Sequence, residues 1–288
     1  MMKYVIAGIK KALQLHRPGR SLVILPDDIF LVSFPKSGNT WSRFLLANLK
    51  YPDQPATFAN IHRLIPDPDR TSKRDFETMH RPRIIKSHEC FDPRYSRVIY
   101  IVRDPRDVTV SQYHYHRKLR KIGDDSPIEL FVTRFLAGKT CPHGSWGENV
   151  ATWLVAREND PRFLLLRYED MVADTCQELT RVADFLGLAA SPQQISAAVE
   201  RSSVSRMKKL EQAETDQCSL TQGSRKDLSF VRSASAGGWH KDLPADQVER
   251  IELAWGPLMR HLGYELSSSA HSPATEMPAR GVLGKVLG

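Results

Sequence analysis

The sequence predicts an α/β protein: a single domain of three layers, in which a central, mostly parallel β-sheet is flanked by helices. Short segments rich in branched apolar residues alternate along the chain with amphipathic helical segments, as in a parallel sheet covered on both faces. The 288 residues suffice for one large domain or two small ones, and no Gly/Ser-rich linker or internal repeat divides them. With 41% hydrophobic and 26% charged residues, the composition excludes fibrous and wholly disordered chains.

The expected strands are runs of branched and aromatic residues bounded by charged or turn-forming residues. They lie at 30–34, 83–86, 97–102 and 162–166. The expected helices are segments in which apolar residues recur at helical spacing. They lie at 40–49, 105–119, 126–137, 145–157, 168–186 and 248–262. One of these helices carries an apolar stripe that we expect in the core, formed by Trp146, Val150, Trp153 and Leu154.

The last third of the chain contains two segments without clear periodicity. Residues 211–238 are rich in Ser, Gly, Gln and charge, so they predict a long loop of the kind that often acts as a lid. Residues 267–288 predict a disordered tail. We therefore expect one domain over residues 1–266.

The charge balance favours an anionic ligand. Lys and Arg number 41 and Asp and Glu 33, and the net charge of +8 suits a small anion, nucleic acid or a membrane surface. No aromatic-basic repeat, zinc pattern or helix-turn-helix signal accompanies this charge, which argues against nucleic acid. The four cysteines lack CxxC or histidine spacing, so we expect free thiols in a reducing compartment, no disulfide framework and no metal site.

The first residues carry a short apolar run at 4–9, which is too short to span a membrane and is not followed by a cleavage site. The sequence thus predicts a cytoplasmic protein without a transmembrane segment. Within residues 1–17, the apolar side chains share one helical face flanked by lysines and arginine. Such a face fits either peripheral contact with an anionic membrane or packing on the chain's own domain.

The segment 30–41 combines a strand, a tight loop and a helix start. The loop carries Lys36 and Gly38, and the helix is expected to start near Thr40. Backbone N–H groups at a helix N-terminus, a glycine and a lysine together form a cradle for a phosphate-like anion. In the loop of nucleoside triphosphatases the lysine directly follows the second glycine, whereas Lys36 precedes the only glycine here. The alternative is an ordinary strand-to-helix turn with a surface lysine.

Two further strands end in residues that suit the same pocket, because ligands of open parallel sheets bind beyond the carboxyl ends of the strands. Lys86 and His88 lie at the end of one strand, and Arg103 lies at the end of the next. In the following helix Ser111 lies about two turns from the start. An arginine and a serine suit a phosphate dianion, and an ion pair between Arg103 and Asp107 is the structural alternative.

These motifs together resemble the sulfotransferases of the cytosolic type, which use 3′-phosphoadenosine 5′-phosphosulfate (PAPS). Pro-Lys-Ser-Gly-Asn-Thr-Trp at 35–41 is similar to that family's Pro-Lys-Ser-Gly-Thr-Thr-Trp loop. Lys-Ser-His at 86–88 is similar to its Lys-Thr/Ser-His element. Residues 101–114 are similar to its Val-x-Arg-(Asn/Asp)-x-x-Asp-Val-x-Val-Ser-x-Tyr-His element. The resemblance implies a P-loop-like phosphosulfate loop and a nucleotide-binding core over residues 30–239.

The resemblance implies an enzyme that moves the sulfuryl group of PAPS to an acceptor hydroxyl or amine by in-line displacement, with PAP as the other product and no metal. In that case His88 is the general base, Lys36 stabilises the leaving phosphate, and Lys86 is a supporting cation. The implied nucleotide-binding residues are Lys36, Ser37, Gly38, Asn39, Thr40, Trp41, Arg103, Ser111, Tyr168 and Arg232.

The chain departs from the family pattern in places. Glu89 and Cys90 replace the usual Leu-Pro after the histidine, on the acceptor side. The residues after Trp239 lack the dimer contact of cytosolic members, so no oligomeric state is predicted. We expect a small-molecule or lipid acceptor and no nucleic acid. The alternatives are a P-loop nucleotide kinase-like phosphotransferase and a basic nucleic-acid- or membrane-binding module.

Overall fold

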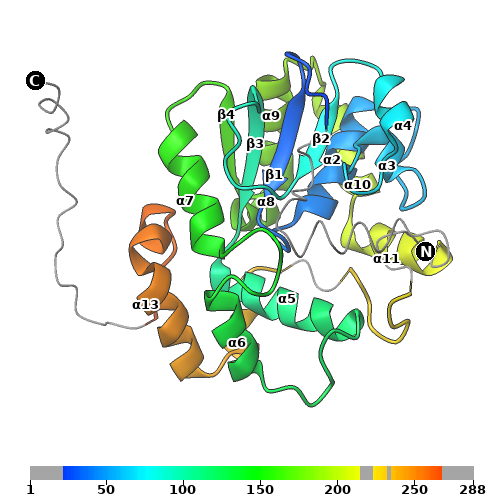
Figure 1. The fold of residues 1–288 in the computed structure, drawn as a ribbon. Helices are drawn as coiled ribbons and strands as arrows, with labels where there is room; N and C mark the ends of the chain where they lie inside the picture. Colours follow the sequence, from blue (N-terminus) through cyan, green and yellow to red (C-terminus); the bar gives the residue numbers. More distant parts are fainter. Residues whose placement is uncertain (1–21, 215–222, 232–234, 268–288) are drawn as a thin grey trace, which may run out of the picture.

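The computed structural model describes residues 22–214, 223–231 and 235–267. Its centre is a sheet of four parallel strands in the order β2-β1-β3-β4 (Figure 1). The strands are β1 (Ile29–Ser33), β2 (Ile84–Ser87), β3 (Arg97–Val102) and β4 (Phe163–Arg167). All four predicted strands are therefore present within one residue of their expected bounds, and the predicted α/β fold class is confirmed.

Helices cover both faces of this sheet. They are α2 (Asn39–Lys50), α3 (Ile61–Leu64), α4 (Lys73–Glu77), α5 (Pro105–Lys118), α6 (Ile128–Leu136), α7 (Trp146–Arg157), α8 (Tyr168–Ala173), α9 (Thr175–Leu186), α10 (Pro192–Arg201), α11 (Val204–Ala213), α12 (Trp239–Asp242) and α13 (Ala245–His261). No helix in the described ranges is both long enough and apolar enough to cross a membrane.

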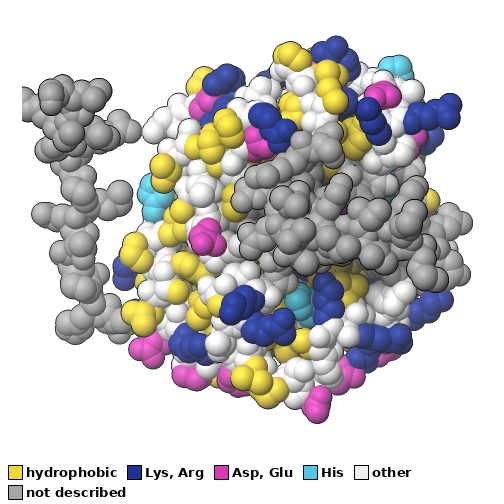
Figure 2. Space-filling model, in the orientation of Figure 1, with side chains coloured by type: hydrophobic (Ala, Val, Ile, Leu, Met, Phe, Trp, Pro, Cys, Tyr) yellow, Lys and Arg dark blue, Asp and Glu magenta, His cyan; other side chains and the backbone are white. Residues whose placement is uncertain are grey.

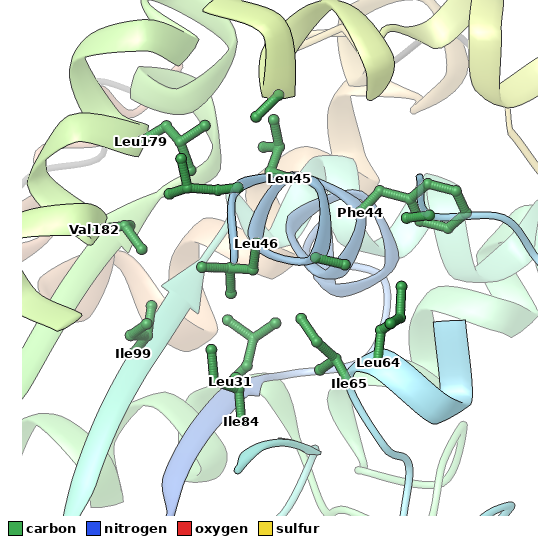
Figure 3. Close-up of a cluster of buried hydrophobic side chains, with 14 of the residues drawn as sticks. Leu31, Phe44, Leu45, Leu46, Leu64, Ile65, Ile84, Ile99, Leu179 and Val182 are labelled. Carbon is green, nitrogen blue, oxygen red and sulfur yellow. The ribbon is translucent and has the colours of Figure 1, made fainter. Parts of the chain in front are cut away.

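The alternation of side chains along β1 creates two separate cores. Ile29 and Leu31 pack with the residues of α2, α9 and α10, whereas Phe30 and Val32 face the residues of α7 and α13. Figure 3 shows the first core, where Leu31 lies below Leu46 of α2. All five β1 residues are buried, as expected for a strand covered on both faces.

The apolar stripe predicted for α7 is confirmed as core, since Trp146 and Trp153 are completely buried. Ser145 caps this helix through a capping box with Glu148, which explains why the sequence pattern located it well. Likewise Asp104 caps α5, with Pro105 as the first helical residue, as predicted.

The predicted helix at 168–186 is wrong as a single element. It is divided into α8 and α9 at Asp174, whose φ of −141° and ψ of 86° are not helical. The Asp174 side chain accepts a hydrogen bond from the backbone N–H of Gln177, so it caps α9. The apolar spacing continues across this break, which is why periodicity alone did not reveal it.

The segment 211–238 is not wholly a loop either, because α11 extends to Ala213. Two longer helices, α10 and α11, were not predicted, although Ser191, Pro192 and Gln194 form a capping box with proline at the first position of α10. The predictions for residues 1–17 and for Arg232 concern parts of the chain outside the described residues. The predicted tail lies outside them as well, apart from Ser267.

The order of the strands determines where a ligand can bind. From β1 the chain passes through α2 to β2 on one side, and β3 then lies on the other side of β1. The point where the strand order reverses leaves a crevice at the carboxyl ends of the strands. Because all strands are parallel, the residues that follow β1, β2, β3 and β4 converge at this edge.

Candidate active site

A cavity of about 840 Å³ lies at this edge of the sheet. Each strand contributes to its wall through a residue at or just after its carboxyl end: Lys36 after β1, His88 after β2, Arg103 after β3 and Tyr168 after β4. The three motifs of the sequence analysis follow β1, β2 and β3. They therefore meet in one pocket, as the sequence predicted.

The loop between β1 and α2 has an unusual backbone. Gly38 has a φ of 98°, and Lys36, although not a glycine, has a φ of 75°. A Cβ atom at Gly38 would lie 2.6 Å from Cδ2 of Tyr168, so only glycine fits there. The N-cap residue of α2 is Gly38 itself, which has no side chain to bond the first N–H groups. The first N–H groups of this 12-residue helix and its dipole thus favour an anion at the cavity.

The Lys36 ammonium lies over two aromatic rings of the cavity wall. Its Nζ is 4.3 Å from the ring centroid of Tyr115 and 4.7 Å from that of Phe230. Such cation–π contacts hold the charge near the cavity. An anion near the start of α2 would therefore meet both a lysine and a helix N-terminus.

His88 is held in a single tautomer. Its Nδ1 lies 2.7 Å from the carbonyl oxygen of Ser33, which only accepts hydrogen bonds, so Nδ1 carries the proton and donates. The lone pair is therefore on Nε2. Burial, followed by the charge of Lys86 and the neighbouring His143, lowers the pKa of His88 well below its ordinary value of 6.5. A neutral imidazole of this kind is able to accept a proton from a ligand hydroxyl.

Lys86 is paired within the protein. Its Nζ lies 2.7 Å from Oδ2 of Asp67, and this carboxylate is almost fully buried. Burial alone would raise the pKa of Asp67, but Lys86 lowers it well below its ordinary value. Both side chains line the cavity, so Lys86 contributes there as half of an ion pair.

Arg103 joins several segments around the cavity. It donates to the backbone oxygens of Lys36 (3.4 Å) and Ser235 (3.1 Å), and its guanidinium lies 4.2 Å from the ring centroid of Tyr168. The predicted structural alternative is also present, since Asp107 lies 3.6 Å from Arg103. Asp107 also accepts hydrogen bonds from the N–H groups of Gly237 and Trp239. The buried Nε of Arg103 has no hydrogen-bond partner in the described chain.

Of the remaining residues predicted to bind the nucleotide, most line the cavity and one does not. Thr40, Trp41 and Ser111 line the cavity. Trp41 packs edge-on against Tyr168 with ring centroids 5.8 Å apart, and its Nε1 donates to the backbone oxygen of Ser202. Ser37 differs, because it is completely buried and is not part of the cavity wall.

Asn39 lines the cavity, and it also connects α2 to β1. Its Nδ2 donates to the Leu31 carbonyl at 3.3 Å and to Ser33 Oγ at 3.2 Å. Ser33 is the residue whose carbonyl orients His88. The amide of Asn39 therefore supports the residue that holds the histidine in place.

Sequence reasoning missed several polar residues of the same cavity, among them Gln112, Thr140 and His143. Thr140 and His143 lie on the loop between α6 and α7, which carries no recognisable motif. Gln112 directly follows Ser111, so among these three residues it is the one that a sequence motif could have indicated. Within the described ranges, no group of His, Cys, Asp or Glu side chains is arranged to hold a metal ion.

Known proteins resemble this chain over most of its length. Residues 26–263 match the family described as Sulfotransferase domain. The chain is 28% identical over 261 residues to sulfotransferase 2A6 of Rattus norvegicus, which covers 85% of this chain and 88% of that protein. It is 26% identical over 242 residues to the amine sulfotransferase of Oryctolagus cuniculus, which covers 80% of this chain and 79% of that protein.

A solved structure agrees with these sequence matches. Mouse sulfotransferase SULT7A1 complexed with PAP is similar to this chain with a TM-score of 0.65 at 28% identity, over 83% of this chain and 87% of that one. The matched region 26–263 includes every strand of the sheet and the described cavity. The chain therefore belongs to the sulfotransferase family, the enzymes that transfer a sulfuryl group from PAPS.

Proposed function

We propose that this sulfotransferase uses His88 as the general base and Lys36 to stabilise the leaving phosphate, in an in-line transfer to an acceptor hydroxyl or amine. The observation that carries this proposal is the arrangement at the strand ends. A neutral histidine with its lone pair on Nε2, a lysine and a helix N-terminus all border one cavity.

The residues at the cavity fit the donor that the family uses. PAPS, when bound, supplies an activated sulfuryl group on a 5′-phosphate, together with a 3′-phosphate and an adenine. The N-terminus of α2 and Lys36 would hold the 5′-phosphate. Arg103, whose buried Nε has no partner in the described chain, and Ser111 would hold the 3′-phosphate. Trp41 and Tyr168 offer aromatic surfaces for the adenine.

Different residues of the chain accept the proton and stabilise the leaving phosphate. His88 accepts the acceptor's proton at Nε2, while its Nδ1–H stays bonded to the Ser33 carbonyl and stabilises the charged ring. Lys36 and the first N–H groups of α2 neutralise the charge that gathers on the departing phosphate. Catalysis of this type depends on positioning and electrostatics, by analogy with phosphoryl transfer.

The nature of the acceptor is part of the proposal. One relative is an amine sulfotransferase, which supports a hydroxyl or amine acceptor for this chain too. A small-molecule or lipid acceptor and a cytoplasmic location stay predictions from the sequence.

The test is a transfer assay with labelled PAPS over phenols, alcohols, amines and glycosides. His88→Ala is expected to lower turnover by about 10²- to 10⁴-fold, the usual contribution of a general base, while PAP still binds. Lys36→Ala is expected to reduce turnover as well. The matched control is His261→Ala, because His261 is an exposed partner of Glu158 far along the chain. Full turnover in the His88 variant would refute the assignment.

A further inference from the structure

The surroundings of the two proposed reactive residues are polar. The ring of His143 lies 5.6 Å from the ring of His88, centroid to centroid. The side chain of Gln112 donates to the backbone oxygen of Pro35, the residue before Lys36. Thr140 lies on the same loop as His143, and all three side chains line the cavity. We call Gln112, Thr140 and His143 the polar wall.

Each residue of the polar wall has a buried polar atom without a hydrogen-bond partner in the described chain. These atoms are Gln112 Oε1, Thr140 Oγ1 and His143 Nδ1. Gln112 is only 2% exposed, Thr140 6%, and the side chain of His143 10%. Burying a polar atom without a partner is unfavourable, so three of them at one cavity indicate a ligand that hydrogen-bonds to them.

The histidine of this wall is suited to hydrogen bonding rather than to ion pairing. Burial, with a further effect of Lys86, lowers the pKa of His143 to about 4, so its ring is neutral at physiological pH. Its nearest carboxylate oxygen, on Glu89, is 3.6 Å from Nδ1. A neutral imidazole offers one donor and one acceptor to a ligand.

The same cavity contains charged and aromatic side chains that fit this picture. Asp69, Arg70 and Lys121 add carboxylate, guanidinium and ammonium groups to its lining. Tyr115 and Phe230 add aromatic rings, which are able to pack on the C–H faces of a ring-shaped ligand. A flat apolar acceptor in this place would leave the three buried atoms of the polar wall unpaired, and the site would discriminate against it.

We propose that the acceptor is a polyhydroxylated molecule of the carbohydrate class, bound through Gln112, Thr140 and His143. The sulfuryl group is transferred to one of its hydroxyl oxygens: the new S–O bond forms there, the bond from sulfur to the 5′-phosphate oxygen of PAPS breaks, and the hydroxyl proton passes to His88. This proposal rests on the proposed function and adds the class of acceptor to it.

The experiment compares matched acceptors with labelled PAPS. The polar probes are 4-nitrophenyl glycosides of glucose, galactose, mannose and N-acetylglucosamine, and the apolar probes are 4-nitrophenol and a 3-hydroxysteroid. The kcat/KM for at least one glycoside is expected to exceed that for either apolar probe at least about tenfold, because a site built for hydrogen bonds rejects a ligand that lacks them.

Variants of the polar wall test the contacts directly. Thr140→Val and Gln112→Leu are each expected to lower kcat/KM for the glycoside about tenfold, since each removes one hydrogen bond of a polar site. Thr140→Ser keeps the hydroxyl and is expected to retain most of the activity. Thr180→Val is the matched control, because the Thr180 hydroxyl is exposed on α9 and bonds only to the helix backbone.

The outcomes separate the two proposals. Better turnover of the apolar probes, or no turnover of any glycoside by protein that binds PAP normally, would overturn the carbohydrate acceptor while leaving the roles of His88 and Lys36 unaffected. Unchanged glycoside kinetics in Thr140→Val and Gln112→Leu would also overturn it. Failure to bind PAP in calorimetry would instead contradict the proposed function itself.

Discussion

His88 shows how one backbone contact is able to prepare a side chain for proton transfer. The carbonyl of Ser33 accepts the Nδ1 proton at 2.7 Å, which leaves the lone pair on Nε2. Burial and the nearby cation of Lys86 both disfavour a second proton on the ring. The histidine is therefore kept in its basic form, and the cost of burying it is offset by the hydrogen bond to β1.

This arrangement predicts the pH dependence of the reaction. A base with a pKa below 6.5 loses activity only when the pH falls through that lowered value. We therefore expect kcat/KM to stay constant from neutral pH down past 6.5 and to decline only at more acidic pH. The measurement is a pH profile of kcat/KM with labelled PAPS. An acidic limb centred at or above 6.5 would contradict the neutral state of His88.

Arg103 carries a second prediction at this scale. Arg103→Ala removes a guanidinium proposed to bind the 3′-phosphate, and charge-assisted hydrogen bonds are worth about 1.5–3 kcal/mol. The Kd for PAP is expected to rise by about one to two orders of magnitude on that basis, with little change in kcat at saturating PAPS. Calorimetry with PAP tests this, and Arg162→Ala, which alters an exposed arginine paired with Asp160, is the control. An unchanged Kd would refute the role of Arg103.

At the scale of elements, the turn from β1 to α2 combines backbone conformation with close packing. Gly38 has to adopt a positive φ and also has to lie directly against the ring of Tyr168. The same glycine thus joins the start of α2 to the start of α8, and so brings the residues after β1 and β4 together. A larger residue would move either the helix N-terminus or the ring.

Gly38→Ala is accordingly expected to weaken PAP binding by at least about tenfold, because the added methyl group displaces Tyr168 or the helix start. The matched control is Gly187→Ala at the end of α9. Gly187 also has a positive φ, 70°, but nothing lies within 4 Å of an added Cβ atom. Both variants are expected to lose stability of about 1 kcal/mol from backbone strain. Equal PAP affinity of the two variants in calorimetry would contradict this role of the glycine.

The whole molecule uses much of its positive charge for structure. The basic run 117–121, at the end of α5, is an example. Arg117 pairs with Asp124, and Lys118 donates to the backbone oxygens of Arg225 and Leu228. These contacts hold the segment 223–231, including the cavity residue Phe230, against α5. Figure 2 shows Lys and Arg side chains spread over the visible part of one face, with Asp and Glu side chains among them.

Three histidines that are buried or partly buried predict how stability depends on pH. Burial lowers the pKa of His62, His116 and His143 to about 4 in each case. In the unfolded chain these groups take up protons below about 6.5, whereas the folded chain excludes those protons until about pH 4. The unfolded state thus binds more protons in this interval, and stability falls as the pH is lowered from 6.5 to 4.

The measurement is the Tm across this pH interval. Wild type is expected to lose Tm steadily from pH 6.5 to 4, and His116→Gln is expected to show a shallower decline because one such group is removed. The control is His261→Gln, which alters an exposed histidine. A Tm that is constant over the interval, or equal slopes in both variants and wild type, would contradict the prediction.

The sequence alone predicted the fold class, the four strands and the cavity position of the residues that follow three of them. Strand periodicity and the capping residues of α5 and α7 are local signals, and they depend on neighbours along the chain. Once parallel strands are predicted, Lys36, His88 and Arg103 are also predicted to share a pocket, because parallel strands bring their carboxyl ends to one edge.

Only the tertiary structure decided which side chains are free for a ligand and which are already paired. Lys86 is paired with Asp67, and Ser37 is buried away from the cavity wall. The polar wall, with Thr140 and His143, comes from a loop more than fifty residues beyond His88 in the sequence, and no local pattern marks it. Pairing, burial and pKa depend on neighbours that folding brings together from distant parts of the chain, so spacing along the sequence does not reveal them.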